Sequence, residues 1–467
     1  MSDRKTKPRT KATPKQRAPK KPAEPSLPPT TGSYFLSLEL ENVRCFSDRQ
    51  TLDLSDGNGR PARWTILLGE NGTGKTTILQ MLAVGTISEP LSDGFVERAR
   101  YREFSHVYHS MRESLIRGDG TKSSQWEFTI AEDVGPGIAP EEGSRGFLAV
   151  EIRPGESHSK WRRRPVQLPT CFAYSVERRL SHHPSLKPEA RLDTAEGLFQ
   201  ETSSIGDSEG WLLRLDYATS KHPRLGEPAR KRLDLVKGVL LRILPDVSDL
   251  RFDASSGFFP TPNVQFKTPY GWVPLKQLGY GYRTMMAWVV DLAARMIERY
   301  PESPDPLAEP AVVLVDEIDL HLHPKWQRNV VGYLTERFPN TQFIVTSHSP
   351  LIVQSAADAN LALLRREGDH VVIENHPETI RGWRIDQVLT SDLFGLPTAR
   401  PPGEEKLILR RDQLLAKSRL TAGDREELRQ IKEKIALPTG ESFDQARTME
   451  LIKDSIEYLK KVRGAES

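Results

Sequence analysis

The sequence predicts an α/β protein, and three observations carry that prediction. Residues 64–68, 311–315 and 342–345 are apolar runs with the length of buried strands. The first run leads directly into a glycine-rich loop and then a helical stretch, the order that a phosphate-binding loop requires. The other two runs end in acidic and other polar side chains. We therefore expect strands that deliver polar groups to a shared site.

The composition is that of a soluble globular protein. The chain has 467 residues, of which 37% are apolar and 28% charged, and this length can bury a substantial core. It has no run of about 18 apolar residues and no leader-like segment, so export and membrane insertion are disfavoured and a cytoplasmic location is expected. Two cysteines, Cys45 and Cys171, exclude a disulfide scaffold and a four-cysteine zinc site.

Residues 1–32 are expected to form a disordered basic tail. They hold nine basic residues against two acidic ones, with seven prolines and almost no apolar side chains. Such a segment cannot offset its ordering entropy by burial. Its cations suit the phosphates of nucleic acid, and a solubilising role without a specific target is an equal alternative.

The rest of the chain divides into four parts. Residues 33–90 begin with strand-like alternation and contain the glycine-rich loop. Residues 91–270 are mixed and poorly periodic, and we expect an inserted region or lid of mixed α+β and helical structure. Residues 271–385 return to the main domain. Residues 386–467 are expected to be a helical extension whose apolar stripes dock on the core of the same chain, with partner binding as the alternative.

The strongest motif is G-E-N-G-T-G-K-T, which fits the phosphate-loop pattern G-x-x-x-x-G-K-[ST]. Glycines let backbone N–H groups curl around phosphate oxygens, and the helix that follows points its positive dipole end at the same anion. Lys75 is expected to meet the β- and γ-phosphates, and Thr76 to bind Mg²⁺. The residues assigned to nucleotide binding here are Gly69, Asn71, Gly72, Thr73, Gly74, Lys75, Thr76 and Thr77.

A pair of acids follows the second apolar run, in V-V-L-V-D-E. A strand beside the phosphate loop can place Asp316 in the Mg²⁺ shell. Glu317 comes next, at the strand tip, where a carboxylate can polarise an attacking water, so we assign it as the general base. Two acids at an ordinary strand end would mean little alone, but the phosphate loop upstream favours these roles.

Histidines form a third element. His348 follows the third apolar run, in T-S-H-S-P, and is expected to hydrogen-bond the γ-phosphate or orient the water. With Lys75 and Glu317 it completes the predicted catalytic set. His321 and His323 form an H-x-H pair, but no third ligand of suitable spacing is evident. A loop role near the nucleotide is therefore preferred to a metal site.

The run L-G-Y-G-Y-R at 278–283 opens a helical stretch with two glycines, Gly279 and Gly281. It predicts a second helix N-terminus that can bind an anion. A single molecule cannot obviously use both ends on one nucleotide. The simplest arrangement is two copies in head-to-tail contact with ATP between them, and a two-fold dimer follows.

Taken in order, these elements resemble the heads of soluble ABC-type ATPases, the branch of the SMC, RecF, zinc-hook repair and overcoming-lysogenisation proteins. The resemblance implies a P-loop NTPase fold of the ABC-ATPase head type, with ATP and Mg²⁺ as cofactors and hydrolysis of ATP to ADP and phosphate. By likeness, the Walker A site is 69–77, the Walker B site is Asp316 and Glu317, the D-loop is 320–323, the signature is 278–283, and the switch histidine is His348.

Departures from the family pattern bear on the expected activity. Gly279 stands where the family has its signature serine, so a hydroxyl contact to the partner's γ-phosphate is missing. The region 91–270 is too short for SMC arms and has no zinc-hook C-x-x-C. No glutamate with a D-x-D cluster follows His348, so a built-in nuclease is not expected. Gln167 is a candidate for the family's Q-loop glutamine.

The compact head with a helical C-terminus looks like the ATPase subunits of bacterial anti-phage systems, the Septu and retron-associated ATPases, which act with a separate HNH nuclease. The resemblance implies a homodimer that closes on ATP and gates a DNA-directed effector. Around Trp161, the cations Lys160, Arg162, Arg163 and Arg164 offer contact to DNA, and a solvated charged face is the equal alternative. Two other functions stay open: a RecF- or SMC-like repair ATPase, and a nucleotide-dependent scaffold with little turnover that restrains a partner.

Overall fold

The computed structural model describes most of the chain between residues 31 and 434. The described ranges are 31–87, 123–141, 144–152, 160–164, 167–176, 179–180, 198–199, 204–205, 207–221, 226–254, 262–377, 380–396, 399, 401–417 and 420–434. The basic tail predicted for 1–32 lies almost wholly outside these residues.

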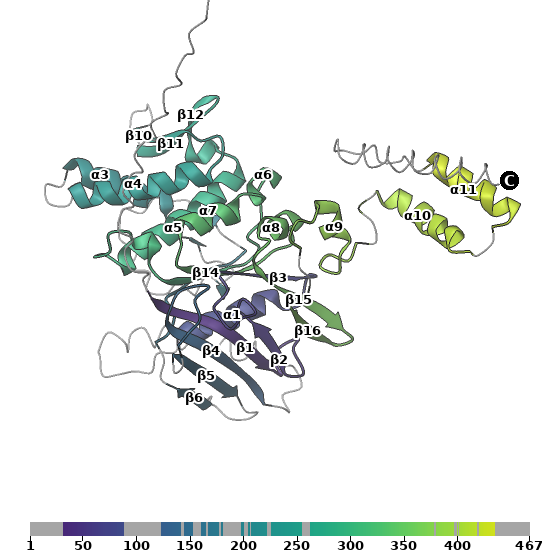
Figure 1. Cartoon of the computed structure of the whole chain (residues 1–467). Helices are drawn as coiled ribbons and strands as arrows, with labels where there is room; N and C mark the ends of the chain where they lie inside the picture. Colours follow the sequence, from purple (N-terminus) through teal and green to yellow (C-terminus); the bar gives the residue numbers. More distant parts are fainter. Residues whose placement is uncertain are drawn as a thin grey trace, which may run out of the picture.

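Six described strands form a central sheet (Figure 1). In spatial order they are β16 (His370–Asn375), β15 (Asn360–Glu367), β3 (Trp64–Gly69), β14 (Thr341–Thr346), β13 (Ala311–Val315) and β7 (Cys171–Tyr174). Among them, β16 alone runs antiparallel to its neighbour. The three predicted buried strands are β3, β14 and β13, which lie side by side in this order. Every residue of β13 and β14 is buried, as in a sheet covered on both faces.

A second sheet, antiparallel, covers one face of the central sheet together with helix α1 (Lys75–Ile87). Its described strands are β2 (Gln50–Asp53), β1 (Gly32–Glu41), β4 (Ser124–Val134), β5 (Arg145–Ile152) and β6 (Lys160–Arg164). Leu67, Val312 and Leu314 of the central sheet pack in the same apolar cluster as β1, β4 and α1.

Helices cover the opposite face of the central sheet, where Figure 1 shows α5 and α7. The helices on this side are α3 (Ser208–Lys221), α4 (Gly226–Ile243), α5 (Tyr280–Arg299), α7 (Val330–Arg337), α8 (Pro350–Ser355) and α9 (Ile385–Thr390). Ile66, Val313 and Val345 point to this face while their strand neighbours point to the other, which is the alternation that strand geometry dictates. Trp288 of α5 is fully buried here.

Smaller elements complete the head. A three-stranded sheet consists of β10 (Asp249–Ala254), β11 (Pro262–Thr268) and β12 (Gly271–Pro274), and the short helix α6 (Pro324–Gln327) follows β13 in the chain. Two-residue strands β8 (Arg179–Leu180) and β9 (Ser204–Ile205) pair in parallel. In the part of the chain that the structure describes, no helix has both the length and the apolar character needed to cross a bilayer.

Residues 91–270, which we expected to form an insertion or lid, contribute described strands to the two sheets of the head. Of the described strands in this region, β4 and β5 extend the antiparallel sheet beside β1, and β7 pairs in parallel with β13. The sequence missed β7 because it has four residues and is buried throughout, so no alternation reveals it. The region therefore completes both sheets of the head.

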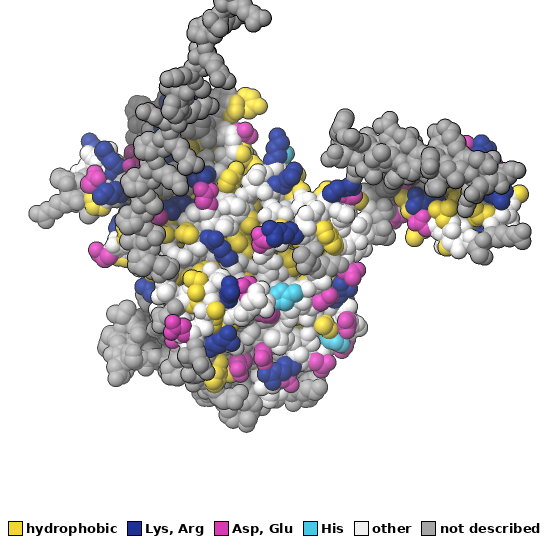
Figure 2. Space-filling model, in the orientation of Figure 1, with side chains coloured by type: hydrophobic (Ala, Val, Ile, Leu, Met, Phe, Trp, Pro, Cys, Tyr) yellow, Lys and Arg dark blue, Asp and Glu magenta, His cyan; other side chains and the backbone are white. Residues whose placement is uncertain are grey.

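The C-terminal extension contains a helical hairpin that stands apart from the head in Figure 1. It consists of α10 (Pro402–Leu415) and α11 (Ala422–Lys434). Leu428 and Ile431, on the stripe predicted to dock on the chain's own core, pack instead against Leu414 of the neighbouring helix. Leu409 and Leu415 are each 56% exposed, and Figure 2 shows apolar side chains on the described part of the hairpin.

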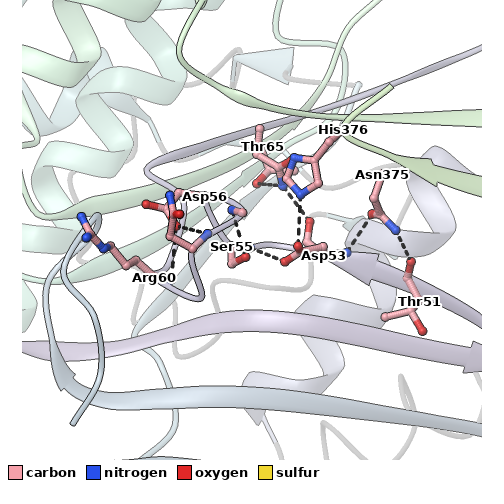
Figure 3. Close-up of polar contacts among 11 residues, drawn as sticks. Thr51, Asp53, Ser55, Asp56, Arg60, Thr65, Asn375 and His376 are labelled. Atoms are coloured by element: carbon pink, nitrogen blue, oxygen red, sulfur yellow. Dashed lines mark hydrogen bonds and ion pairs between the residues drawn. The ribbon is translucent and has the colours of Figure 1, made fainter. Parts of the chain in front are cut away.

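Asp53, at the end of β2, joins the antiparallel sheet to the central one (Figure 3). Its backbone N–H donates to the Asn375 side chain at 2.8 Å, and its carbonyl accepts from Asn360 at 2.6 Å. Its carboxylate accepts from the Ser55 N–H at 2.8 Å and lies 3.1 Å from His376 Nε2. Burial raises the pKa of Asp53, but hydrogen bonds from His376 and Ser55 together lower it by more, so the pKa lies below its ordinary value.

Candidate nucleotide-binding and catalytic site

The loop between β3 and α1 has a backbone that glycine adopts far more readily than other residues. Gly69, Gly72 and Gly74 have φ values of +142°, +79° and +85°. A Cβ atom at Gly69 would lie 2.5 Å from the carbonyl oxygen of Leu364, and one at Gly74 would lie 2.5 Å from Cys45 Sγ. At Gly72 it would meet no described atom within 4 Å. The loop is therefore tightly packed at both ends and open in the middle.

Lys75 begins α1, and its side chain folds back over this loop. Its Nζ donates to the carbonyl oxygens of Gly69 and Glu70, each at 2.8 Å. Lys75 is buried, and burial lowers its pKa, although the carboxylates of Asp316 and Glu317 oppose this effect. An anion in the loop would favour the charged ammonium form. The electrostatics of the loop therefore suit a phosphate.

Thr76 and Asp316 meet at the edge of the central sheet. The Thr76 hydroxyl donates to Asp316 Oδ2 at 2.6 Å, although 240 residues separate the two. Thr346, at the end of β14, donates its hydroxyl to Asp316 Oδ1, also at 2.6 Å. Both oxygens of this buried carboxylate therefore accept hydroxyl hydrogen bonds. The contact brings the end of β13 against the first turn of α1, where the parallel strands end.

Oxygen ligands of this kind are the ones that Mg²⁺ prefers, and Thr76 and Asp316 supply a hydroxyl and a carboxylate. The wrapped loop and Lys75 supply N–H and ammonium donors for phosphate oxygens. The residues present therefore fit a magnesium-bound nucleoside triphosphate. The chain has the α/β fold of a P-loop NTPase. The P-loop fold predicted from the sequence is confirmed.

Glu317 has a strained backbone. Its φ of +47° lies in the left-handed region, which costs a residue with a Cβ roughly 1–2 kcal/mol. Its N–H donates to Thr346 Oγ1 at 2.7 Å. Glu317 is partly exposed, whereas Asp316 before it is buried. The two adjacent acids therefore differ in environment, and strain at such a position is typical of a functional site. The role of general base stays a prediction.

His348 lies at the same edge of the sheet, after β14, and is exposed. Its backbone N–H donates to Asp319 Oδ1 at 3.3 Å, which connects its loop to the loop that follows β13. Ser349 then caps α8 by accepting from the N–H groups of Leu351 and Ile352. His348 is thus an exposed residue between two buried serines, on a loop that is hydrogen-bonded to the acidic loop. Its catalytic role stays a prediction.

The H-x-H pair shapes the loop after β13. His323 caps α6, and its Nδ1 accepts from the Lys325 N–H at 3.2 Å. His321 has a φ of +63°, and its ring meets the Tyr280 ring edge-on at 4.6 Å. The contacts of His321 and His323 are therefore those of a loop that packs against α5.

The predicted signature run lies at the N-terminus of α5. Gly279 is the N-cap of this helix, is exposed, and has no side chain to cap the first N–H groups. A Cβ atom at Gly281 would lie 2.4 Å from the His321 carbonyl oxygen, so glycine is needed there for α5 to approach the loop after β13 in the same molecule. Contact of Gly279 and Gly281 with a second molecule's nucleotide stays a prediction.

Two polar residues of the site were not predicted from the sequence. Arg44 donates through Nη1 to Thr77 Oγ1 at 3.0 Å and to Gln80 Oε1 at 2.9 Å, so it holds the first turns of α1. Burial lowers the pKa of Arg44. Thr346 contacts both Walker B acids. The position of Thr346 at a strand end beside the site was a usable signal, whereas the contact of Arg44 depends on tertiary packing.

The structure describes some of the other predicted site residues fully and others only by their backbone. Residues Lys160–Arg164, proposed for DNA contact, form β6 and pair with β5, and their side chains lie outside the described part. Asn71 is exposed on the phosphate loop, and Thr73 donates its hydroxyl to the Glu70 carbonyl at 2.8 Å. Gln167 is exposed, and its N–H donates to the Glu132 carboxylate. A Q-loop role for Gln167 stays a prediction.

Two family models match this chain. Residues 37–205 match a model described as an AAA domain. Residues 239–354 match a model described as an AAA domain, putative AbiEii toxin, Type IV TA system. The first range contains the phosphate loop, and the second contains both acids and His348.

The curated relatives that match this chain include bacterial proteins named for Septu and for retrons. The Septu protein PtuA of Bacillus mycoides is 25% identical over 405 residues, which is 86% of this chain and 50% of that protein. The Retron Ec83 probable ATPase of Escherichia coli is 34% identical over 176 residues, 38% of this chain and 30% of that protein. This chain thus spans half the length or less of these two relatives. The Septu protein PtuA of Bacillus thuringiensis is 23% identical, over 72% of this chain and 80% of that protein.

Solved structures similar to this chain include SMC heads. The SMC head bound to the C-winged helix domain of ScpA has 15% identity and a TM-score of 0.44, covering 73% of this chain and 98% of that chain. The SMC head domain from Thermotoga maritima has 13% identity and a TM-score of 0.38, with the same coverage of 73% and 98%.

Proposed function

We propose that this protein binds and hydrolyses MgATP and uses the nucleotide state to control a DNA-directed effector in bacterial anti-phage defence. One observation carries the proposal: the Thr76 hydroxyl contacts the Asp316 carboxylate at 2.6 Å. The phosphate loop and the acidic strand end thereby converge on a site that suits a magnesium-bound triphosphate. The similarity to Septu protein PtuA and to the retron probable ATPases supports the defence setting.

Each residue has a distinct task in this proposal. Magnesium, when bound, neutralises charge on the β- and γ-phosphates. Thr76 and Asp316 would hold the ion, and Lys75 would contact the phosphates. Glu317, partly exposed at the strand tip, would accept a proton from the attacking water. His348 would hydrogen-bond the γ-phosphate.

Two copies would close on ATP, with the N-terminus of α5 in each copy facing the nucleotide of the other. The open N-terminus at Gly279 supports this arrangement, since its backbone N–H groups suit an anion. A separate nuclease would be the effector. DNA would be contacted through the basic tail and β6, whose cations are Lys160, Arg162, Arg163 and Arg164.

The Glu317→Gln variant tests the catalytic part of the proposal. Glutamine keeps the size of the side chain but cannot act as a base, so ATP hydrolysis should fall by about 10²- to 10⁴-fold while nucleotide binding is kept. Turnover is measured as phosphate release, and binding is measured with a fluorescent ATP analogue. One chain has a mass of 52.7 kDa, and light scattering of the ATP-bound variant should give twice that mass.

The matched control is Lys75→Ala, which should lose nucleotide binding because the phosphates lose their ammonium partner. Undiminished hydrolysis in the glutamine variant would refute the assignment of the base. Nucleotide binding that survives the loss of Lys75 would refute the phosphate loop. A single-chain mass with ATP bound would refute the dimer.

A second candidate function is a nucleotide-dependent scaffold that scarcely hydrolyses ATP and restrains a partner. The observation that favours it is Gly279, whose position lacks the hydroxyl of the family's signature serine. Phosphate release by the unmodified protein, measured with and without DNA, separates the two functions. A Gly279→Ser variant that turns over ATP much faster than the natural chain would favour the scaffold.

A further inference from the structure

Gln327, the last residue of α6, connects two loops of the site. Its side-chain nitrogen donates to the carbonyl oxygens of Leu322 at 3.0 Å and Asp319 at 3.3 Å, in the loop that follows Glu317. Its side-chain oxygen accepts from the Ser349 hydroxyl at 2.8 Å, in the loop that carries His348. One partly buried amide therefore bridges the loop of the predicted base and the loop of the predicted switch histidine.

At the strand ends, Thr346 accepts from the Glu317 N–H at 2.7 Å and from the Ile318 N–H at 3.0 Å. Beyond the strand ends, the other direct contacts between these segments are longer. The His348 N–H donates to Asp319 Oδ1 at 3.3 Å, and the Ser355 hydroxyl donates to the Gln327 carbonyl at 3.4 Å. Hydrogen bonds of this length are weak. Beyond the strand ends, the bond from the Ser349 hydroxyl to Gln327 is the shortest hydrogen bond described between the two loops.

The segment is also fixed on its other side, by α5. The ring of Trp326 meets the Tyr282 ring edge-on at 4.3 Å. The His321 carbonyl contacts α5 at Gly281, where a Cβ atom would lie 2.4 Å away. Gln327 is thus attached to a segment that α5 already holds, so its amide can fix the His348 loop against a firm support.

We propose that Gln327 is a positioning residue that keeps the loops of Glu317 and His348 in register for ATP hydrolysis. The proposal rests on the function proposed above. Gln327 acts through Leu322, Asp319 and Ser349. The task needs a side chain that donates at one end and accepts at the other, which an amide does and a carboxylate does not.

The Gln327→Glu variant provides the test, because it keeps size and shape. A carboxylate oxygen would then face two carbonyl oxygens in place of the donor. We expect kcat for ATP hydrolysis to fall about 10- to 100-fold, as for a shift of about 1 Å in a catalytic group. The dissociation constant for a fluorescent ATP analogue should stay within about twofold, since the phosphate loop is untouched.

The matched control is Asn329→Asp, the same amide-to-acid change two residues further along. The Asn329 side chain donates to the Lys325 carbonyl at 2.8 Å, within its own turn, so kcat should not change. The loss in a Gln327→Ala, Ser349→Ala double variant should be smaller than the sum of the two single losses, because both single changes break the bond between Gln327 and Ser349. Ser349→Ala alone also removes the N-cap of α8. Thermal melting confirms that each variant is folded.

Hydrogen exchange gives a readout that does not need turnover. In Gln327→Glu, peptides covering 318–323 and 347–352 should both exchange faster, and in Asn329→Asp neither should. A normal kcat in Gln327→Glu, or additive losses with Ser349→Ala, would overturn the proposal. If the natural chain binds ATP without hydrolysing it, the proposed function fails, but the exchange experiment still tests the coupling of the two loops. Exchange that is unchanged in either loop of Gln327→Glu would then overturn the coupling as well.

Discussion

At the scale of single residues, two glycines of the phosphate loop have the same backbone conformation but are packed differently. Gly74 and Gly72 have nearly the same left-handed backbone, with φ values of +85° and +79°. They differ in their surroundings. A Cβ atom at Gly74 would lie 2.5 Å from Cys45 Sγ and 3.0 Å from the Phe46 ring, whereas at Gly72 it would meet no described atom within 4 Å.

The pair Gly74→Ala and Gly72→Ala separates backbone strain from crowding. Both variants carry a strain of roughly 1–2 kcal/mol, since alanine disfavours this backbone. Gly74→Ala should lose about 1–3 kcal/mol more of the free energy of unfolding, because the extra methyl overpacks the loop against Cys45. Urea unfolding measures the difference. Equal losses in the two variants would show that Cys45 and Phe46 move aside freely.

At the scale of elements, a buried charge pair on α5 accepts a hydrogen bond from the central sheet. Asp291 and Arg295 lie one turn apart on α5, with side chains 8% and 15% exposed, and Arg295 Nε donates to Asp291 at 2.6 Å. Tyr174, at the end of β7, donates its hydroxyl to the same carboxylate oxygen at 3.1 Å. Burial lowers the pKa of Arg295, but Asp291, Tyr174 and Glu298 together raise it by more, so the guanidinium stays charged. The helix that begins with the signature run is thereby fixed beside the acidic strand.

Removing one member of this pair should be worse than removing both. Asp291→Ala leaves the buried guanidinium without its partner, which typically costs 3–5 kcal/mol. The double variant Asp291→Leu, Arg295→Met replaces the pair with apolar side chains and should recover most of that loss, apart from the lost hydrogen bond between Tyr174 and Asp291. Urea unfolding of the three proteins measures this. A double variant less stable than Asp291→Ala would contradict the expectation.

At the scale of the whole molecule, the two large sheets are coupled at Asp53. The hydrogen bonds of this residue reach β15, β16 and the turn after β2 (Figure 3). Because the phosphate loop belongs to the central sheet and α1 packs between both sheets, motion of one sheet against the other would disturb the nucleotide site.

Asp53→Asn should weaken this coupling in a pH-dependent way. The pKa of Asp53 is depressed in the folded protein, so its charged form adds stability above the unfolded carboxyl value of about 3.9. That stability is lost as the pH falls through the folded value. At pH 6 the free energy of unfolding of the natural chain should exceed that of the variant by ~1 kcal/mol. This value is small because Asp53 is partly exposed, and solvent screens its interactions. A difference that persists at pH 2.5 in urea unfolding would refute this account.

The sequence predicted the parts of the fold that depend on local pattern. The strands β3, β13 and β14 each contain an apolar run, and the phosphate loop has a fixed spacing of glycines, so both were identifiable. Contacts between segments that are far apart in the sequence were harder to predict. Nothing local showed that Thr346 would contact Asp316, that Gln327 would reach Ser349, or that Leu428 would pack on α10, because each contact depends on how distant segments pack.

The position of β3 in the sheet has a consequence during synthesis. Its two neighbours, β14 and β15, come from residues 341–367. At about 5–20 residues per second, a ribosome needs roughly 15–60 seconds to make the intervening chain. For that time the nascent protein carries an apolar strand that cannot complete its pairing. A polypeptide terminated before residue 341 would contain the whole glycine-rich motif and still be unable to build the pocket.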